Sequence, residues 1–253
     1  MLHRETTGAG PRLVLIHGFT QTSESWGPVA ADLALDHEVV RVDAPGHGRS
    51  SGVRADQWEG ARLLGQAGGR ATYVGYSMGG RLALHLALSQ PGLVERLVLV
   101  SATAGIDDAG ARAERREADD QLACELERSG VDTFLERWLR LPLFAGLDPA
   151  RADLDARRRN TVPGLSSSLR LAGTGTIEPA LWDRLGSMEM PVLVVAGQQD
   201  PKVPALADRL GATSGAGATL DVRAGAGHAV PLAAPEAFVA ALRSFLSAKE
   251  PSR

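Results

Sequence analysis

The strongest indication of catalytic chemistry in this sequence is a serine that lies between two glycines. Ser77 lies in the stretch Gly-Tyr-Ser-Met-Gly at 75–79. The apolar residues 71–74 before it predict a short buried strand, and the Leu- and Ala-rich residues 78–89 after it predict a helix that ends before Pro91. A strand, a tight turn bearing a serine and a helix form a nucleophile elbow, which lifts the hydroxyl clear of the sheet.

An acid and a base follow late in the chain. Asp200 comes just after the apolar stretch 191–197, and His228 follows the β-prone stretch 219–223 through a glycine-rich turn. Because the carboxyl ends of parallel strands meet at one edge of a sheet, both side chains are expected beside Ser77. The order Ser, Asp, His fits a catalytic triad on an elbow. His228 would accept the serine proton, and Asp200 would orient the imidazole.

Two backbone N–H groups are expected to form an oxyanion hole beside the serine. The strand-like stretch 12–16 runs into His17 and Phe19, and Met78 directly follows the serine. The N–H groups of Phe19 and Met78 would face a developing oxyanion, where each donor can contribute about 3 kcal/mol to a transition state. His17, and His47 in the turn-rich loop that follows the next strand, are interpreted as structural.

The composition limits what else the chain could do. Its 253 residues allow one large domain with an insertion, and a net charge of −3 gives no sign of a nucleic-acid or membrane partner. Since neither a membrane-length apolar run nor a signal-peptide pattern is visible, we expect a cytoplasmic enzyme. The single cysteine, Cys124, has no base at motif spacing, and we expect it to be buried or half-buried and inert. His85, on the elbow helix, is interpreted as a packing or pocket-wall residue.

Strand patterns alternate with helical ones along the chain. Their apolar runs predict strands buried on both faces, and hence a doubly wound, mostly parallel α/β sheet. The predicted strands are 12–16, 38–42, 71–74, 97–100, 191–197 and 219–223. Between about 105 and 186 the stretches are helical and charged, with no convincing strand. We therefore expect residues 105–186 to form a helical cap, or lid, inserted into a core of residues 1–104 and 187–253.

These motifs together resemble the α/β-hydrolase superfamily over essentially the whole chain. The elbow at 75–79, the His-Gly loop after 12–16 and the Asp-Ala-Pro-Gly-His-Gly-Arg-Ser loop at 43–50 each match its pattern. The resemblance implies an α/β-hydrolase fold with the Ser77 triad at the carboxyl edge of the sheet.

A narrower resemblance lies in the predicted cap. With the elbow, six stretches are similar to the family of 2-succinyl-6-hydroxy-2,4-cyclohexadiene-1-carboxylate synthases of menaquinone biosynthesis: 115–123, 134–138, 141–144, 164–170, 173–175 and 179–182. This resemblance implies a lyase that eliminates pyruvate from 2-succinyl-5-enolpyruvyl-6-hydroxy-3-cyclohexene-1-carboxylate. It implies a small-molecule polycarboxylate as substrate and no metal or organic cofactor.

Arginines are expected to hold the substrate carboxylates, because a guanidinium binds a carboxylate through two parallel hydrogen bonds. Arg81 lies one helical turn after Ser77, and the alternative is that it forms a salt bridge within the protein. The resemblance gives the same role to Arg115 and to one of the arginines at 157–159, of which we choose Arg158.

Two aromatic residues complete the expected binding site. Tyr76 precedes the serine, and Trp138 lies in the predicted cap, where it would line an apolar wall together with Phe144. Packing in the core is the alternative for Trp138 and Phe144. The Ser-Ser-Ser stretch at 166–168, where the family is expected to be more apolar, and the short connector 53–70 could both alter the shape of the pocket.

Two other functions fit the core motifs. A carboxylesterase or a carbon–carbon bond hydrolase would use the same triad, so that only the cap separates it from the lyase. A non-enzymatic binding protein can also retain this fold. The oligomeric state stays open.

Overall fold

The computed structural model describes residues 1–200, 209 and 218–248, and a seven-stranded sheet forms the centre of this part of the chain. The strand order is β1-β3-β2-β4-β5-β6-β7, and every neighbouring pair is parallel except β1 with β3. The strands are β1 Arg4–Thr7, β2 Arg12–Ile16, β3 Glu38–Val42, β4 Ala71–Tyr76, β5 Val94–Val100, β6 Val192–Gly197 and β7 Ala218–Arg223. The predicted doubly wound, mostly parallel sheet is therefore confirmed.

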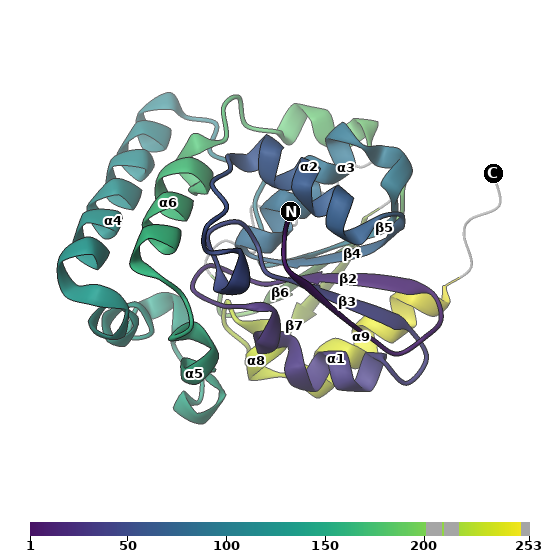
Figure 1. Cartoon of the computed structure of the whole chain (residues 1–253). Helices are drawn as coiled ribbons and strands as arrows, with labels where there is room; N and C mark the ends of the chain where they lie inside the picture. The colour runs from purple at the N-terminus through teal and green to yellow at the C-terminus, as the bar shows by residue number, and fades with distance from the viewer. Residues whose placement is uncertain (201–208, 210–217, 249–253) are drawn as a thin grey trace.

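Helices cover both faces of this sheet (Figure 1). Helices α2 (Gln57–Gly68) and α3 (Met78–Ser89) pack together on one face, and α1 (Gly27–Leu33) and α9 (Pro235–Ser247) pack together on the other. Each pair closes its own apolar cluster against the strands. β4 is buried along its whole length because it lies between these two clusters, which accounts for its mostly apolar sequence.

Two local features were not predicted from the sequence. Strand β1 pairs antiparallel with β3 at the edge of the sheet, and its charged, mostly exposed residues gave no strand signal. Thr22 caps the turn that leads into α1: its hydroxyl accepts a hydrogen bond from the Glu24 N–H at 3.3 Å, and its own N–H donates to the Ser25 hydroxyl at 3.3 Å.

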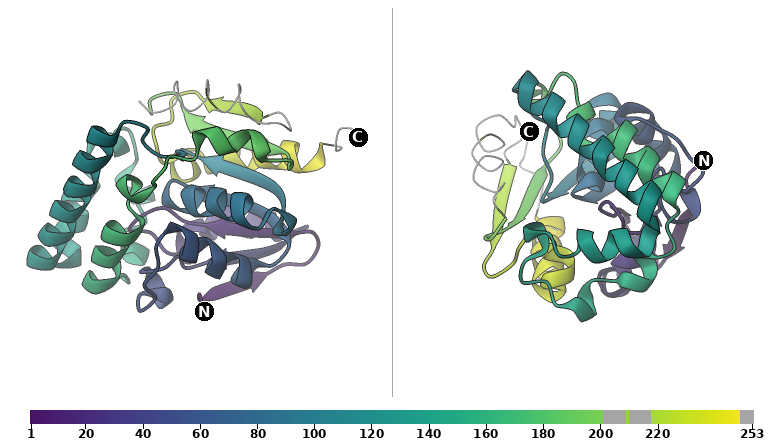
Figure 2. Two further views of the ribbon diagram at one scale, coloured as in Figure 1. Left: turned by 90° about the horizontal axis from the view of Figure 1, so that it is seen from above. Right: turned by 90° about the vertical axis from the view of Figure 1, so that its left-hand side faces the viewer.

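Residues 105–186, all described by the structure, contain helices and turns but no strand. We call them the cap segment. Helix α4 (Ala109–Trp138) breaks at Gly130, where φ is 77°, and packs along α6 (Val162–Ala172), as both views of Figure 2 show. The one-turn helix α5 (Leu154–Arg157) lies between them in the chain.

The cap segment lies over the carboxyl edge of the strands. Ser168, on α6, contacts Met78 at the start of α3, with 3.5 Å between the hydroxyl oxygen and the sulfur. Gly46, in the loop after β3, lies directly against Gly164 of the same helix. Side chains at the ends of β2, β3 and β4 therefore lie beneath this segment.

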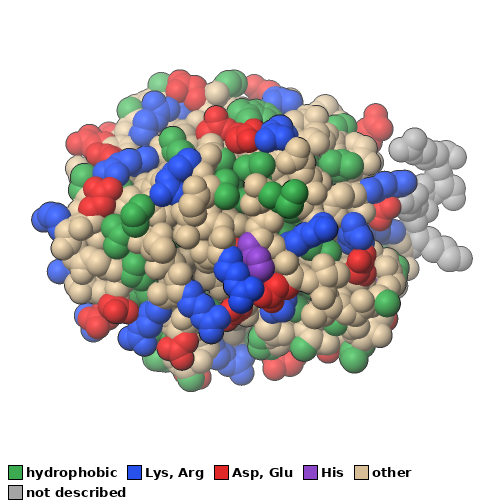
Figure 3. All heavy atoms as spheres, viewed as in Figure 1, with side chains coloured by type: hydrophobic (Ala, Val, Ile, Leu, Met, Phe, Trp, Pro, Cys, Tyr) green, Lys and Arg blue, Asp and Glu red, His purple; other side chains and the backbone are tan. Residues whose placement is uncertain are grey.

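The surface carries charges of both signs. Figure 3 shows Arg side chains interspersed with Asp and Glu over one face of the molecule. In the described part of the chain, no helix is long and apolar enough to cross a membrane.

Candidate active site

The turn between β4 and α3 holds Ser77 in a conformation that few side chains adopt. Its φ of 52° and ψ of −106° cost roughly 1–3 kcal/mol, and the surrounding contacts maintain them. The Ser77 N–H donates to the Val100 carbonyl at 2.8 Å. A Cβ at position 75 would lie 2.4 Å from the Gly79 oxygen, and one at position 79 would lie 2.3 Å from the Ile16 oxygen, so both positions require glycine.

The structure brings Ser77, His228 and Asp200 into one hydrogen-bonded chain. The Ser77 hydroxyl lies 2.9 Å from His228 Nε2, and His228 Nδ1 lies 2.6 Å from an Asp200 carboxylate oxygen. An N–H at Nδ1 donates to the carboxylate and leaves Nε2 to accept the serine proton. Asp200 and His228 are each 3% exposed, whereas Ser77 keeps more of its surface accessible.

The backbone N–H groups of Phe19 and Met78 are the predicted donors of the oxyanion hole. Met78 is the first residue of α3, where N–H groups have no partner within the helix. Among the described residues, neither the Phe19 nor the Met78 N–H has a hydrogen-bond acceptor. Neither N–H group is therefore committed to another acceptor of the described residues, and their role as an oxyanion hole stays a prediction.

Arg81 is a buried cation on the first turns of α3. It is 9% exposed, and its Nη2 donates to the Ala172 carbonyl at 3.0 Å. No carboxylate of the described residues forms an ion pair with it, and its Nε is buried without an acceptor. Burial, and then the nearby charge of Arg115, lower the pKa of Arg81 to about 10, so the side chain stays charged at neutral pH.

Arg115 approaches Arg81 from α4 of the cap segment. Its Nε bonds an Asp119 carboxylate oxygen at 2.9 Å, and that carboxylate also favours the charged form of Arg81. The structure thus gathers two of the predicted arginines between α3 and the cap segment.

The third predicted arginine requires a correction. Arg158 is exposed at the surface and pairs with Asp132 at 2.9 Å. Its neighbour Arg157 is 1% exposed: its guanidinium bonds the Thr20 hydroxyl and lies over the Phe144 ring, 5.9 Å from the centroid. Because α5 is a single turn, no helical periodicity in the sequence could distinguish the inward arginine from the outward one.

Comparisons with known proteins agree with this geometry. Residues 13–241 match the alpha/beta hydrolase family. The chain belongs to this family. A 2-succinyl-6-hydroxy-2,4-cyclohexadiene-1-carboxylate synthase of Serratia proteamaculans is 31% identical, with 93% of each chain covered.

Two solved structures of the alpha/beta hydrolase fold are also similar. MenH from S. aureus is 27% identical and superposes with a TM-score of 0.90, covering 97% of this chain and 98% of that chain. A thermophilic esterase from Thermogutta terrifontis, solved with malate bound, is 25% identical, with a TM-score of 0.79 and coverage of 97% and 92%.

His17 and His85 of this alpha/beta hydrolase form hydrogen bonds and packing contacts within the core. His17 bonds the Gly18 carbonyl at 2.8 Å through Nδ1 and accepts from the Ala44 N–H at 3.1 Å through Nε2, so both ring nitrogens are occupied. His85 donates from Nδ1 to the Arg81 carbonyl at 2.7 Å and packs edge-on against Trp58. Burial lowers the pKa of His17 and lowers that of His85 to about 4, so both are neutral at neutral pH.

The two predicted aromatic residues differ in position. Tyr76 is 4% exposed, and its ring packs 5.5 Å from the His228 ring, so it supports the histidine and offers little surface to a substrate. Trp138 is half-buried, with its ring centroid 5.2 Å from that of Phe19 and 5.9 Å from that of Phe144. Trp138 thus packs against Phe19 and Phe144, which fits both a wall residue and core packing, and its role in binding stays a prediction.

Two further expectations concern cysteine and metals. Cys124 is exposed on α4, and the prediction that it is buried or half-buried was wrong, because the weakly amphipathic sequence of this helix did not reveal which face lies outward. In the described part of the chain, no three His, Cys, Asp or Glu side chains gather where they could hold a metal ion.

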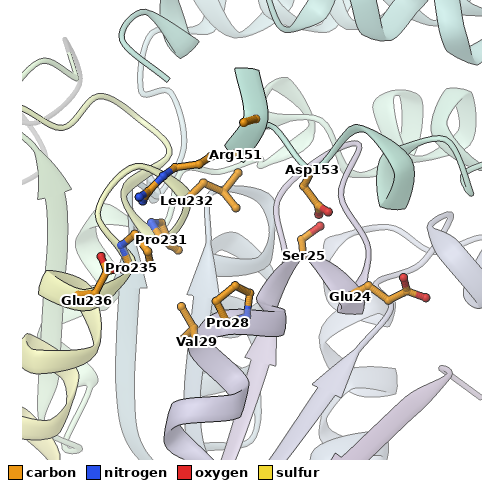
Figure 4. A pocket seen from close by; sticks show the side chains of 11 residues that line it. Glu24, Ser25, Pro28, Val29, Arg151, Asp153, Pro231, Leu232, Pro235 and Glu236 are labelled. Carbon is orange, nitrogen blue, oxygen red and sulfur yellow. The ribbon is translucent and has the colours of Figure 1, made fainter. Parts of the chain in front are cut away.

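A cavity of about 340 Å³ opens on another side of the cap segment (Figure 4). Asp153 and Ser25 point toward each other on one side of it, and Pro231 and Leu232 lie on the other side. The lining includes no triad residue, none of the three predicted substrate-binding arginines and neither predicted oxyanion-hole residue, so this cavity is separate from the arrangement around Ser77.

Proposed function

We propose that this chain is a lyase that eliminates pyruvate from 2-succinyl-5-enolpyruvyl-6-hydroxy-3-cyclohexene-1-carboxylate, giving 2-succinyl-6-hydroxy-2,4-cyclohexadiene-1-carboxylate. The observation that carries this proposal is Arg81, a buried cation one helical turn from Ser77 that forms no direct ion pair with a carboxylate of the described residues. A buried charge is costly unless it is paired, so this position favours a substrate that supplies the anion. The similarity to the Serratia synthase and to MenH supports the same conclusion.

Proton removal from carbon would start the reaction. His228, oriented by Asp200, makes the Ser77 oxygen basic enough to take the proton from ring carbon 2, next to the succinyl carbonyl. The carbonyl oxygen gains negative charge, which the Phe19 and Met78 N–H groups stabilise. The electron pair then moves through the 3-ene to form the 2,4-diene, and the bond from carbon 5 to the enolpyruvyl oxygen breaks. The released enolate takes up a proton and becomes pyruvate, so Ser77 acts as a base and no acyl-enzyme forms.

The cap segment would act as the lid of this site. It contributes Arg115 beside Arg81, and Trp138 beside Phe19. Residues 105–186 would thus provide substrate recognition, while residues 1–104 and 187–253 provide the triad. Two adjacent guanidinium groups suit a polycarboxylate, because each can bind one carboxylate through paired hydrogen bonds.

The test is pyruvate release from the isochorismate-derived precursor, followed together with the absorbance of the diene. Ser77→Ala and His228→Ala should each lower kcat by several orders of magnitude, and Asp200→Asn should do so because it favours the wrong imidazole tautomer. Thermal unfolding of each variant checks that the fold is retained. Near-normal pyruvate release by Ser77→Ala would reject the assignment of the base.

A carboxylesterase is the second candidate, because the 2.9 Å contact between Ser77 and His228 equally suits a serine nucleophile. The similarity to the Thermogutta esterase also favours it. Hydrolysis of simple aryl esters, measured beside pyruvate release, separates the two functions. Fast ester turnover with no pyruvate from the precursor would reject the lyase and select the hydrolase.

A further inference from the structure

Thr20, which directly follows Phe19, has a backbone conformation that is rare for its residue type. Its φ is 67°, in the left-handed region that β-branched residues avoid. It is fully buried. A strained residue at this point persists only if its surroundings hold it there.

Every polar group of Thr20 is held by another side chain. Its N–H donates to His47 Nε2 at 3.3 Å, and its carbonyl accepts from Asn160 Nδ2 at 2.6 Å. Its hydroxyl bonds the Arg157 guanidinium, which also lies 3.4 Å from the Phe19 carbonyl oxygen. The peptide unit between Phe19 and Thr20 is therefore fixed at both its oxygen and its N–H.

Asn160 links this loop to two other segments. Besides the Thr20 carbonyl, its Nδ2 donates to the Arg157 carbonyl at 2.9 Å, and its Oδ1 accepts from the Gly48 N–H at 2.9 Å. The side chain is 5% exposed and lies 140 residues from Thr20 in the chain. One amide group thus joins the loop after β2, the loop after β3 and the cap segment.

We propose that Asn160 is a positioning residue for the oxyanion hole. By holding Thr20 in its strained conformation, it fixes the direction of the preceding Phe19 N–H, which would otherwise relax with the loop. The oxyanion hole is therefore complete only when the cap segment packs against the core so that Asn160 can bond Thr20. The inference rests on the proposed function in one respect, namely that the Phe19 N–H stabilises an oxyanion.

The first test is the rate at which a fluorophosphonate labels Ser77, because the phosphoryl oxygen of that probe occupies the oxyanion hole whatever the natural substrate is. Asn160→Ala should label about 10- to 100-fold more slowly than the wild type, the effect expected when a donor is misplaced. Arg159→Ala is the matched control, because the neighbouring Arg159 also crosses from cap segment to core, to Glu24, without touching Thr20. It should label within threefold of the wild type.

The pH dependence of labelling separates positioning from damage to the triad. The Asn160→Ala profile should keep the wild-type midpoint, because Asn160 does not contact His228 or Asp200 among its hydrogen bonds. Labelling within threefold of the wild type in a folded variant would overturn the inference. A slower rate accompanied by a shifted midpoint would also overturn it, since the effect would then act through the histidine.

A measurement on the wild-type protein covers the case in which the variant does not fold. Asn160 is the only asparagine in the chain, so ¹⁵N-asparagine labelling gives a single side-chain amide in the NMR spectrum. Its two protons should exchange slowly with solvent and shift when Ser77 is phosphonylated. Exchange as fast as that of a free asparagine would refute the proposal that Asn160 holds Thr20. A protein that releases no pyruvate but passes both tests would lose the lyase assignment and keep this inference.

Discussion

At the scale of single residues, Arg81 indicates that the substrate carries a negative charge. The fold buries this cation and places a second cation, Arg115, near it, so that both burial and repulsion lower its pKa, to about 10. The shift is too small to neutralise the side chain at pH 7. An anionic group bound at this position would relieve both penalties, which is why we assign it to a substrate carboxylate.

The Arg81→Ala variant tests this assignment. A hydrogen-bonded charge contact contributes about 1.5–3 kcal/mol, so kcat/KM for the polycarboxylate precursor should fall roughly 10- to 150-fold. Hydrolysis of a small neutral aryl ester should change little, because such a substrate has no carboxylate to bind. Arg158→Ala, which removes an exposed cation paired with Asp132, should leave both activities unchanged. Equal losses of both activities in Arg81→Ala would mean that Arg81 is structural.

At the scale of elements, the approach of α3 to the strands decides the geometry of the elbow. Gly79 faces the carbonyl oxygen of Ile16, at the end of β2, and Gly75 faces the backbone of α3 itself. The helix can therefore begin directly above the sheet, with its N-terminal N–H groups beside Ser77. Any side chain at these positions would push the helix away from the strands.

The Gly79→Ala variant should measure the importance of this close approach. Its Cβ would lie 2.3 Å from a backbone oxygen that cannot move aside easily, so we expect a loss of about 1–3 kcal/mol in the free energy of unfolding, together with impaired activity. Gly92→Ala is the control, because its Cβ would meet no atom within 4 Å. Urea denaturation measures both. A Gly79→Ala variant as stable as Gly92→Ala would show that α3 can shift without cost.

For the whole molecule, buried neutral histidines couple stability to pH. Burial is the largest cause that lowers the pKa of His47 to about 3 and of His85 to about 4, from the ordinary 6.5. Below pH 6.5 the unfolded chain binds protons that the folded chain does not. This contribution to stability is thus complete above pH 6.5 and is lost as the pH falls toward 3–4.

We therefore expect the free energy of unfolding to fall on acidification from pH 7 to pH 5. Each histidine can add a slope of up to about 1.4 kcal/mol per pH unit. His85→Gln, which can still donate to the Arg81 carbonyl, should be less stable at pH 7 but should show a shallower decline. Urea denaturation series at several pH values measure the slope. A variant slope as steep as that of the wild type would contradict the role of His85.

Much of this arrangement follows from the sequence itself. The elbow, the apolar strands and the chain order of Ser77, Asp200 and His228 are local patterns, and the parallel sheet brings strand ends to one edge whatever the details of packing. The fold class and the proximity of these three side chains could therefore be predicted. Their catalytic role, and that of the cap segment, stay predictions that the experiments above test.

Other features depend on contacts between distant segments. The sequence did not distinguish Arg157 from Arg158, did not show that Tyr76 lies inside the core, and gave no reason to single out Asn160. The positions of Arg157, Arg158 and Asn160 are set by which surface of the cap segment meets the loops after β2 and β3. Neither hydrophobic periodicity nor motif spacing encodes that surface in a one-turn helix or an irregular loop, so only the tertiary structure decides it.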